Sequence, residues 1–137
     1  MNIKITDKLI KMEVYIKDLK KIKPYSYKKY LSDNITKYAI ERLIQLVIDL
    51  ALDINNIIIK NEGYYPASDY YNSFIKLVEI GVLSEKFAYK IAPSTGIRNR
   101  LVHEYEKVND KIIFENIEKT CDYYIQYMKY MNKYINN

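Results

Sequence analysis

The stretch that decides the fold runs from residue 34 to residue 60 and reads NITKYAIERLIQLVIDLALDINNIIIK. Its apolar residues recur at steps of three and four, which is the spacing of one face of an α-helix and not of a β-strand. Ser32 or Asp33 can cap the start of this helix. The predicted apolar stripe consists of Ala39, Leu43, Leu46, Leu50, Ile54 and Ile57, widened by Ile35, Val47 and Ile58. We therefore expect a long central helix around which the other segments pack.

Polar residues of the same helix form a second line, four residues apart each time. They are Glu41, Gln45, Asp49 and Asp53. A polar line on an amphipathic helix is usually a solvated face. The alternative is a polar wall, made by Glu41, Gln45 and Asp49, beside an active site or along a contact between subunits.

The remaining segments also have helical periodicity, and they are separated by the three glycines and three prolines of the chain. Helices are predicted over about residues 6–22 with a cap at Thr6 or Asp7, from Ser68 to Gly81, from Ser84 to Ile91, from Ile97 onward, and from Asp110 to the end. Residues 24–31 form a loop or a short helical turn. The prediction is an all-α, up-and-down bundle of about five helices, forming a single domain over residues 1–137.

The last predicted helix has two apolar-leaning faces. The first contains Cys121, which we interpret as a small buried hydrophobe and not as a nucleophile. The second is a line of tyrosines, in a chain with 16 of them: Tyr123, Tyr127, Tyr130 and Tyr134. Tyrosines can stack on nucleic-acid bases, but at helical spacing they more often line the edge of a core. Two such faces on one helix favour a homodimer or a higher oligomer.

Composition excludes several classes of protein. One cysteine cannot form an internal disulfide, and one cysteine with one histidine cannot build a protein zinc site. No segment has the apolar length of a signal peptide or of a membrane span. A metal site made of carboxylates alone stays open, although no spacing in the sequence indicates one. We expect a cytosolic protein without a metal or cofactor. The net charge of +5 and the isoelectric point near 9.0 give weak support for a polyanionic partner such as RNA.

The candidate catalytic groups lie within residues 96–105, which read GIRNRLVHEY. This stretch holds the one histidine of the chain, His103, and two of its three arginines, Arg98 and Arg100. A guanidinium binds phosphate through parallel hydrogen bonds, and an imidazole can give or take a proton near neutral pH. The cluster favours chemistry on a phosphodiester. A basic helix end with an incidental histidine is the alternative.

Metal-free cleavage of RNA needs a base for the 2′-hydroxyl, an acid for the leaving 5′ oxygen, and positive charge at the phosphate. His103 can act as acid or base, Arg98 or Arg100 can bind the phosphate, and Asn99 can bind phosphate or orient the imidazole. On an ideal helix Arg98 and His103 lie about 140° apart, whereas Arg98 and Tyr105 share a face. A two-fold dimer would supply two histidines. If the chain is a ribonuclease, we therefore expect its site to span a dimer interface.

The run Arg98-Asn99-Arg100-Leu101-Val102-His103-Glu104-Tyr105 resembles the signature of HepT-type toxins, which is Arg, four residues, His, one residue and Tyr. These toxins belong to the HEPN (higher eukaryotes and prokaryotes nucleotide-binding) superfamily. Residues 39–45, 49–53 and 74–91 are similar to the family in order and spacing. The resemblance therefore covers most of the chain.

The resemblance implies a metal-independent endoribonuclease that is the toxin of a type VII toxin–antitoxin pair. Arg98 and His103 would be its catalytic residues at a dimer interface, with Asn99 and Arg100 in support. The implied partner is a minimal nucleotidyltransferase antitoxin, which attaches AMP to Tyr105 as O-AMP-tyrosine. The added phosphate would compete for the guanidinium of Arg98.

Two other functions stay open from the sequence. The chain could be a non-catalytic nucleotide- or protein-binding subunit that partners a minimal nucleotidyltransferase, and this hypothesis shares every sequence feature with the ribonuclease. It could also be a plain helical interaction module, which would leave the arginine–histidine cluster unexplained.

Overall fold

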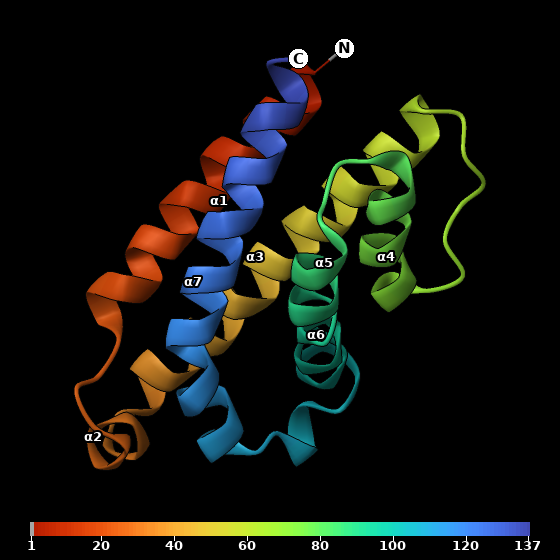
Figure 1. Ribbon diagram of the computed structural model, residues 1–137. Coiled ribbons are helices and arrows are strands. Elements are labelled where there is room, and N and C mark those ends of the chain that lie inside the picture. The colour runs from red at the N-terminus through yellow and green to blue at the C-terminus, as the bar shows by residue number, and fades with distance from the viewer. Residues whose placement is uncertain (1) are drawn as a thin grey trace.

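The computed structural model describes residues 2–137, and all regular secondary structure in that range is helical (Figure 1). The elements in chain order are α1 (Ile3–Ile22), α2 (Tyr27–Ser32), α3 (Asn34–Asn61), α4 (Tyr70–Ile80), α5 (Glu85–Ile91), α6 (Ser94–His103), the 3₁₀-helix η1 (Tyr105–Lys107) and α7 (Asp110–Ile135). The predicted all-α class is confirmed. Residues 24–31, left open between a loop and a helical turn, contain most of α2.

The central helix is α3, as the sequence predicts. It contacts α1, α2, α4, α6 and α7. In Figure 1 the long helices α1 and α7 run side by side to one side of α3, and α4, α5 and α6 lie to the other. Asp33 caps α3 by accepting a hydrogen bond from the backbone N–H of Thr36 at 3.1 Å. Because α6 packs directly on α3, the central helix fixes the position of the arginine–histidine stretch.

The face of α3 that is buried differs from the predicted stripe. Of that stripe Val47, Ile54 and Ile58 are buried, whereas Ile35 is 82% exposed and most other members are half-buried. The residues of α3 that are buried are Ile40, Ile44, Val47, Ile48, Ala51, Leu52, Ile54, Asn55, Ile58 and Ile59. This helix is apolar around most of its circumference, so the spacing of its apolar residues does not decide which side packs inward.

The tyrosines of α7 pack within the chain, so the argument from this helix for a homodimer is wrong. Tyr127 is fully buried and donates to the side-chain oxygen of Asn55 at 2.6 Å. The ring of Tyr130 stacks on Phe87 with centroids 5.0 Å apart, and Tyr134 donates to a carboxylate at the end of α3. Both apolar-leaning faces of α7 are therefore covered by this chain. The homodimer itself stays a prediction.

Local signals located several helix boundaries. The hydroxyl of Ser84 accepts from a backbone N–H of α5, and Gly81 has a left-handed φ of 92°, as predicted. Three helix starts differ from the prediction, and one of them is that of α6, which begins at Ser94 and not at Ile97. Asp69 caps α4 instead of Ser68, since its carboxylate accepts from the first turn at 2.7 Å, and α1 begins at Ile3, ahead of the predicted cap.

Two expectations from composition can be compared with the structure. Cys121 is buried, as predicted, and burial raises the pKa of its thiol. Within residues 2–137, none of the helices is both long enough and apolar enough to cross a membrane.

Candidate active site at the end of α6

The first turn of α6 is fixed in the core. The hydroxyl of Ser94 lies 2.7 Å from a carbonyl oxygen of α5 and 2.7 Å from the hydroxyl of Tyr124. The Thr95 hydroxyl donates to the next carbonyl at 2.8 Å, and both side chains are buried. The helix begins at Ser94 and not at Ile97, because Pro93 has helical dihedral angles. This anchored turn sets the direction in which α6 carries the candidate residues.

Arg98 is the most constrained of these residues, with a side chain only 14% exposed. Its Nε donates to the carboxylate of Asp49 at 2.6 Å, and its Nη1 donates to the side-chain oxygen of Asn99 at 3.3 Å. Its guanidinium also lies over the ring of Tyr70, at 4.9 Å from the centroid. A guanidinium has five N–H donors in a rigid plane. Held in this way, it keeps a fixed orientation and retains donors for a phosphate.

Two residues of the predicted polar wall belong to this arrangement. Asp49 accepts from Arg98, and it also accepts from the side-chain amide of Gln45 at 3.4 Å. Its side chain is 30% exposed, so the ion pair is only partly screened by water. Asp49 therefore connects α3 to α6 and orients the guanidinium.

The other polar residues of α3 lie elsewhere. Asp53 pairs with Lys8 of α1 at 3.3 Å. Glu41 lies two turns before Asp49, about 12 Å along the helix axis. Its carboxyl is close to Lys37 and Asp110, and burial raises its pKa against the opposing effect of the lysine charge. The predicted wall is thus divided, and Glu41 does not reach Arg98.

His103 is the last residue of α6, and it lines a large cleft. The cleft has a volume of about 1130 Å³ and is formed by the end of α3, the segment 64–71 and α6. Asn99 and Thr95 line it from the preceding turns of α6, and Tyr70 lines it from α4. Tyr70 also lies against Arg98, so one residue of the cleft lining contacts the guanidinium.

Tyr105 lies outside α6, which corrects the expectation that it shares a helix face with Arg98. The helix ends at His103, and Glu104 leaves helical geometry with φ −130° and ψ 36°. Tyr105 begins η1 and is 69% exposed. A smaller hollow of about 280 Å³ is lined by His103, Tyr105 and the residues between and after them. The structure therefore places Tyr105 beside His103.

Sequence reasoning missed one side of the site. Neither Tyr70 nor Tyr71 was predicted as a site residue, although both line the cleft of His103. The tyrosine-rich segment 64–71, next to the capping residue of α4, is the signal that could have found them. The predicted supporting residue Arg100 is exposed, and within residues 2–137 it makes no ion pair.

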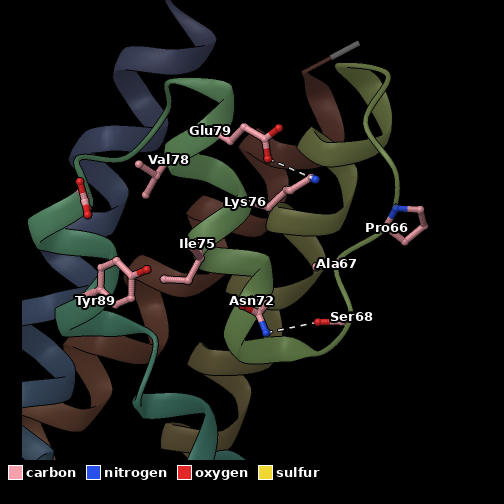
Figure 2. A pocket seen from close by; sticks show the side chains of 10 residues that line it. Pro66, Ala67, Ser68, Asn72, Ile75, Lys76, Val78, Glu79 and Tyr89 are labelled. Atoms are coloured by element: carbon pink, nitrogen blue, oxygen red, sulfur yellow. Dashed lines mark hydrogen bonds and ion pairs between the residues drawn. The ribbon is translucent and has the colours of Figure 1, made fainter.

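A separate hollow, on the other side of segment 64–71, differs from the cleft in the residues that line it. Figure 2 shows it between α4, α5 and residues 66–68, with a volume of about 450 Å³. Lys76 points toward Glu79 and pairs with it at 3.2 Å, and Glu85 adds a second carboxylate to the lining. No predicted catalytic residue lines this hollow. Its balance of charge does not favour a polyanion.

Comparison with known proteins gives family and fold. The model of the family described as "Ribonuclease HepT-like" matches residues 12–131. The tRNA nuclease HepT of Aphanizomenon flos-aquae (strain 2012/KM1/D3) is 35% identical over 121 residues, which cover 88% of this chain and 82% of that protein. A putative RNase of Archaeoglobus fulgidus is 32% identical over 72 residues, covering 53% and 54% of the two chains.

Solved structures with the same fold are known. The tri-AMPylated HEPN toxin of Shewanella oneidensis, solved in complex with MNT antitoxin, has a TM-score of 0.86 and 19% identity, covering 97% of this chain and 99% of that one. YutE of Bacillus subtilis, a cytosolic protein of unknown function, has a TM-score of 0.77 at 19% identity, covering 95% and 90%. At these identities the likeness shows the fold. By the family match and the 35% identical relative, the chain belongs to the HepT-like ribonuclease family, which confirms the predicted resemblance and enzyme class, an RNA endonuclease.

Proposed function

We propose that this chain is the toxin of a type VII toxin–antitoxin pair, that it works as one helical domain, and that it cleaves RNA without a metal ion at Arg98 and His103. The observation that carries the proposal is that His103 lines a cleft whose lining includes Tyr70 and Asn99, the two residues that also contact Arg98. Asp49 orients the guanidinium of Arg98. The name of the Aphanizomenon relative makes tRNA the first substrate to assay.

The chemistry follows from the two side chains. The 2′ oxygen forms a bond to phosphorus, and the bond to the 5′ oxygen breaks, which leaves a 2′,3′-cyclic phosphate and a free 5′-hydroxyl. A base takes the 2′ proton, and an acid gives a proton to the leaving oxygen. His103 fills one of these roles. Arg98 binds the phosphate and stabilises its developing charge, and because its orientation is already fixed, little reorganisation is needed at the transition state.

A second copy of the chain supplies the other imidazole. One chain has one histidine, and a two-fold pair brings two. The proposal is supported by the face of α3 that leads to Asp49, where Ile35 is 82% exposed and Tyr38 is 62% exposed. Leu46 on the same face is half-buried and lies outside the core cluster. Pairing two such faces would bury this apolar surface and bring the two copies of α6 together.

The proposed antitoxin is a minimal nucleotidyltransferase that adds AMP to Tyr105. The tyrosine oxygen would attack the α-phosphorus of ATP, with pyrophosphate as the leaving group. The exposure of Tyr105 makes its hydroxyl accessible, and its position beside His103 means that the added phosphate would repel the phosphate of RNA there. The AMPylated toxin in the Shewanella complex supports this form of control.

The test is cleavage of tRNA by the purified chain in excess EDTA. His103→Ala and Arg98→Ala are each expected to lower the rate by about 100-fold or more, since removal of one general acid–base or phosphate-binding group costs that much. Lys28→Ala removes an exposed positive charge from α2 and serves as the control. Undiminished cleavage by either variant would refute the assignment. An inactive wild type would favour the non-catalytic subunit.

A further inference from the structure

A second hollow adjoins the cleft of His103. It has a volume of about 690 Å³ and lies between α1 and the C-terminal half of α3. Asn56 and Lys60 of α3 line both the cleft and this hollow. The two are therefore adjacent, and together they extend from His103, across the end of α3, to the first half of α1.

Lysines from two helices line the second hollow. Lys4, Lys8 and Lys11 follow the spacing that puts residues on one face of a helix, and Lys60 comes from α3. Four lysines face two aspartates, and one of these carboxylates, Asp53, is already paired with Lys8. Within residues 2–137, Lys4 and Lys11 make no ion pair. The hollow therefore has an excess of positive charge, unlike the one in Figure 2.

The cleft of His103 is lined by aromatic rings instead. Tyr64, Tyr70 and Tyr71 line it and are 37% to 41% exposed, so part of each ring is accessible. Single-stranded nucleic acids are bound by this combination, with aromatic rings that stack on bases beside a positive groove that follows the backbone. Neither contact depends on the RNA sequence, because an aromatic ring can stack on any base and lysines bind the phosphates of any sequence.

We propose that these two hollows form the path of a single-stranded RNA. A base next to the cleaved phosphate stacks in the tyrosine-lined cleft, and the following phosphates run over Lys60 to Lys4 and Lys11 between α3 and α1. The inference rests on the proposed cleavage at His103, and it adds the direction in which the strand leaves the site.

RNA binding by the His103→Ala protein tests the path without needing catalysis. Fluorescence anisotropy would compare labelled single strands of about 4 and about 16 nucleotides, the usual range of such sites. Lys4→Ala with Lys11→Ala is expected to weaken binding of the long strand by about tenfold and to reduce its salt slope by about 1.4, at about 0.7 per phosphate contact. The short strand, held in the cleft, is expected to bind as before. The matched control, Lys21→Ala with Lys28→Ala, removes the same charge away from the groove and is expected to change neither.

A second pair of variants tests the stacking. Tyr71→Ala is expected to weaken binding of both strands by about tenfold, whereas Tyr65→Ala, in the same segment but outside the cleft lining, is expected to leave both unchanged. Circular dichroism confirms that each variant is folded.

Three results separate the outcomes. The groove variant is the one with Lys4→Ala and Lys11→Ala, and the lysine control is the one with Lys21→Ala and Lys28→Ala. If the long strand binds both equally tightly, the proposed path is wrong. The path is also wrong if the groove variant binds RNA normally but no longer binds the nucleotidyltransferase. That result would assign the groove to a protein partner. If the wild type fails to cleave RNA in EDTA while the groove variant still loses long RNA, the cleavage proposal fails and the binding path stands.

Discussion

The two ends of α6 differ in how their side chains are held. At its start, Ser94 and Thr95 are buried, and their hydroxyls are bonded to the carbonyls of the preceding turn and to Tyr124. At its end, His103 and then Tyr105 are exposed beside hollows. The difference shows how a short helix can present reactive groups to solvent without weakening the core. Substitutions at the two ends should therefore separate stability from function.

The largest effect is expected at the open end. Tyr105→Phe removes the hydroxyl that would receive AMP, so transfer from the nucleotidyltransferase should be abolished while RNA cleavage persists. Mass spectrometry of the intact chain after incubation with the partner and ATP would measure the added AMP. Tyr25→Phe, at an 89% exposed tyrosine, is the control and should be modified like the wild type. AMP on the Phe variant, with no other change, would contradict the assignment of Tyr105.

A substitution at the start of α6 should lower the stability of the protein. Ser94→Ala leaves the buried hydroxyl of Tyr124 without its partner, and the free energy of unfolding should fall by about 1–3 kcal/mol. Urea denaturation measures this loss, and the cleavage rate of the folded protein should not change. In the double variant with Tyr124→Phe, the two losses should not add, because both substitutions remove one hydrogen bond. Simple additivity would mean that this bond does not anchor α6.

Arg98 lies between the two ends, and its orientation depends on a different helix. Asp49→Asn keeps the shape of the side chain but removes the charge that faces Nε of Arg98, so kcat/KM for RNA should fall by about tenfold, or 1.4 kcal/mol. Asp122→Asn, at an exposed position of α7, is the matched control. Equal activity of the Asp49 variant and the wild type would show that the guanidinium does not need this partner.

Glu41, an acidic residue of α3 outside the site, should make stability depend on pH. Burial raises the folded-state pKa of Glu41 above its ordinary value of 4.5, so its contribution favours the fold at low pH and is lost as the pH rises through the folded pKa. Glu41→Gln should therefore be more stable than the wild type at pH 7, and the difference should vanish below about pH 4.5, the ordinary pKa of the group. Lys37 keeps Asp110 as its partner at 2.9 Å. Urea unfolding across pH 4–8 would contradict the account if the Gln variant were the less stable at pH 7.

The smallest loss of stability is expected at Tyr30, which contrasts with the bonded tyrosine beside α6. Its hydroxyl is buried, and no partner for it is found among residues 2–137. Tyr30→Phe should therefore not lower the free energy of unfolding and should raise it by up to about 1–3 kcal/mol, because it removes a buried polar group that makes no hydrogen bond. Tyr127→Phe, which breaks the bond to Asn55, should lower the free energy of unfolding. A loss of stability at Tyr30, measured by urea denaturation, would show that its hydroxyl is bonded.

Periodicity and capping residues predicted the helices well, because these signals are local. Asp33, Ser84 and Gly81 mark boundaries through bonds or dihedral angles within one turn. The buried face of α3 could not be predicted, because isoleucines and leucines of this helix lie on most of its sides. The helices that pack against α3 decide which of these residues are buried. The prediction that α6 continues to Tyr105 was also wrong, because the helix ends at His103.

The candidate site was partly predictable for a similar reason. Arg98, His103 and Asn99 lie within one short stretch, and Asp49 stands out on a polar line of α3. Tyr70 contacts Arg98 from a helix that is distant in the sequence, and a single sequence carries no signal of that contact. The lysines of α1 were not predicted as site residues, and only the packing of α1 against α3 places them along one side of a hollow.

A mixed dimer tests most directly whether the site needs the imidazoles of two chains. A wild-type chain and a His103→Ala chain would be combined through two different affinity tags and purified as the mixed pair. Because the proposed site uses His103 of both copies as acid and base, the mixed dimer should cleave RNA in EDTA about 100-fold more slowly than the wild-type dimer. A mixed dimer that keeps about half of the wild-type rate would contradict a site built from two chains.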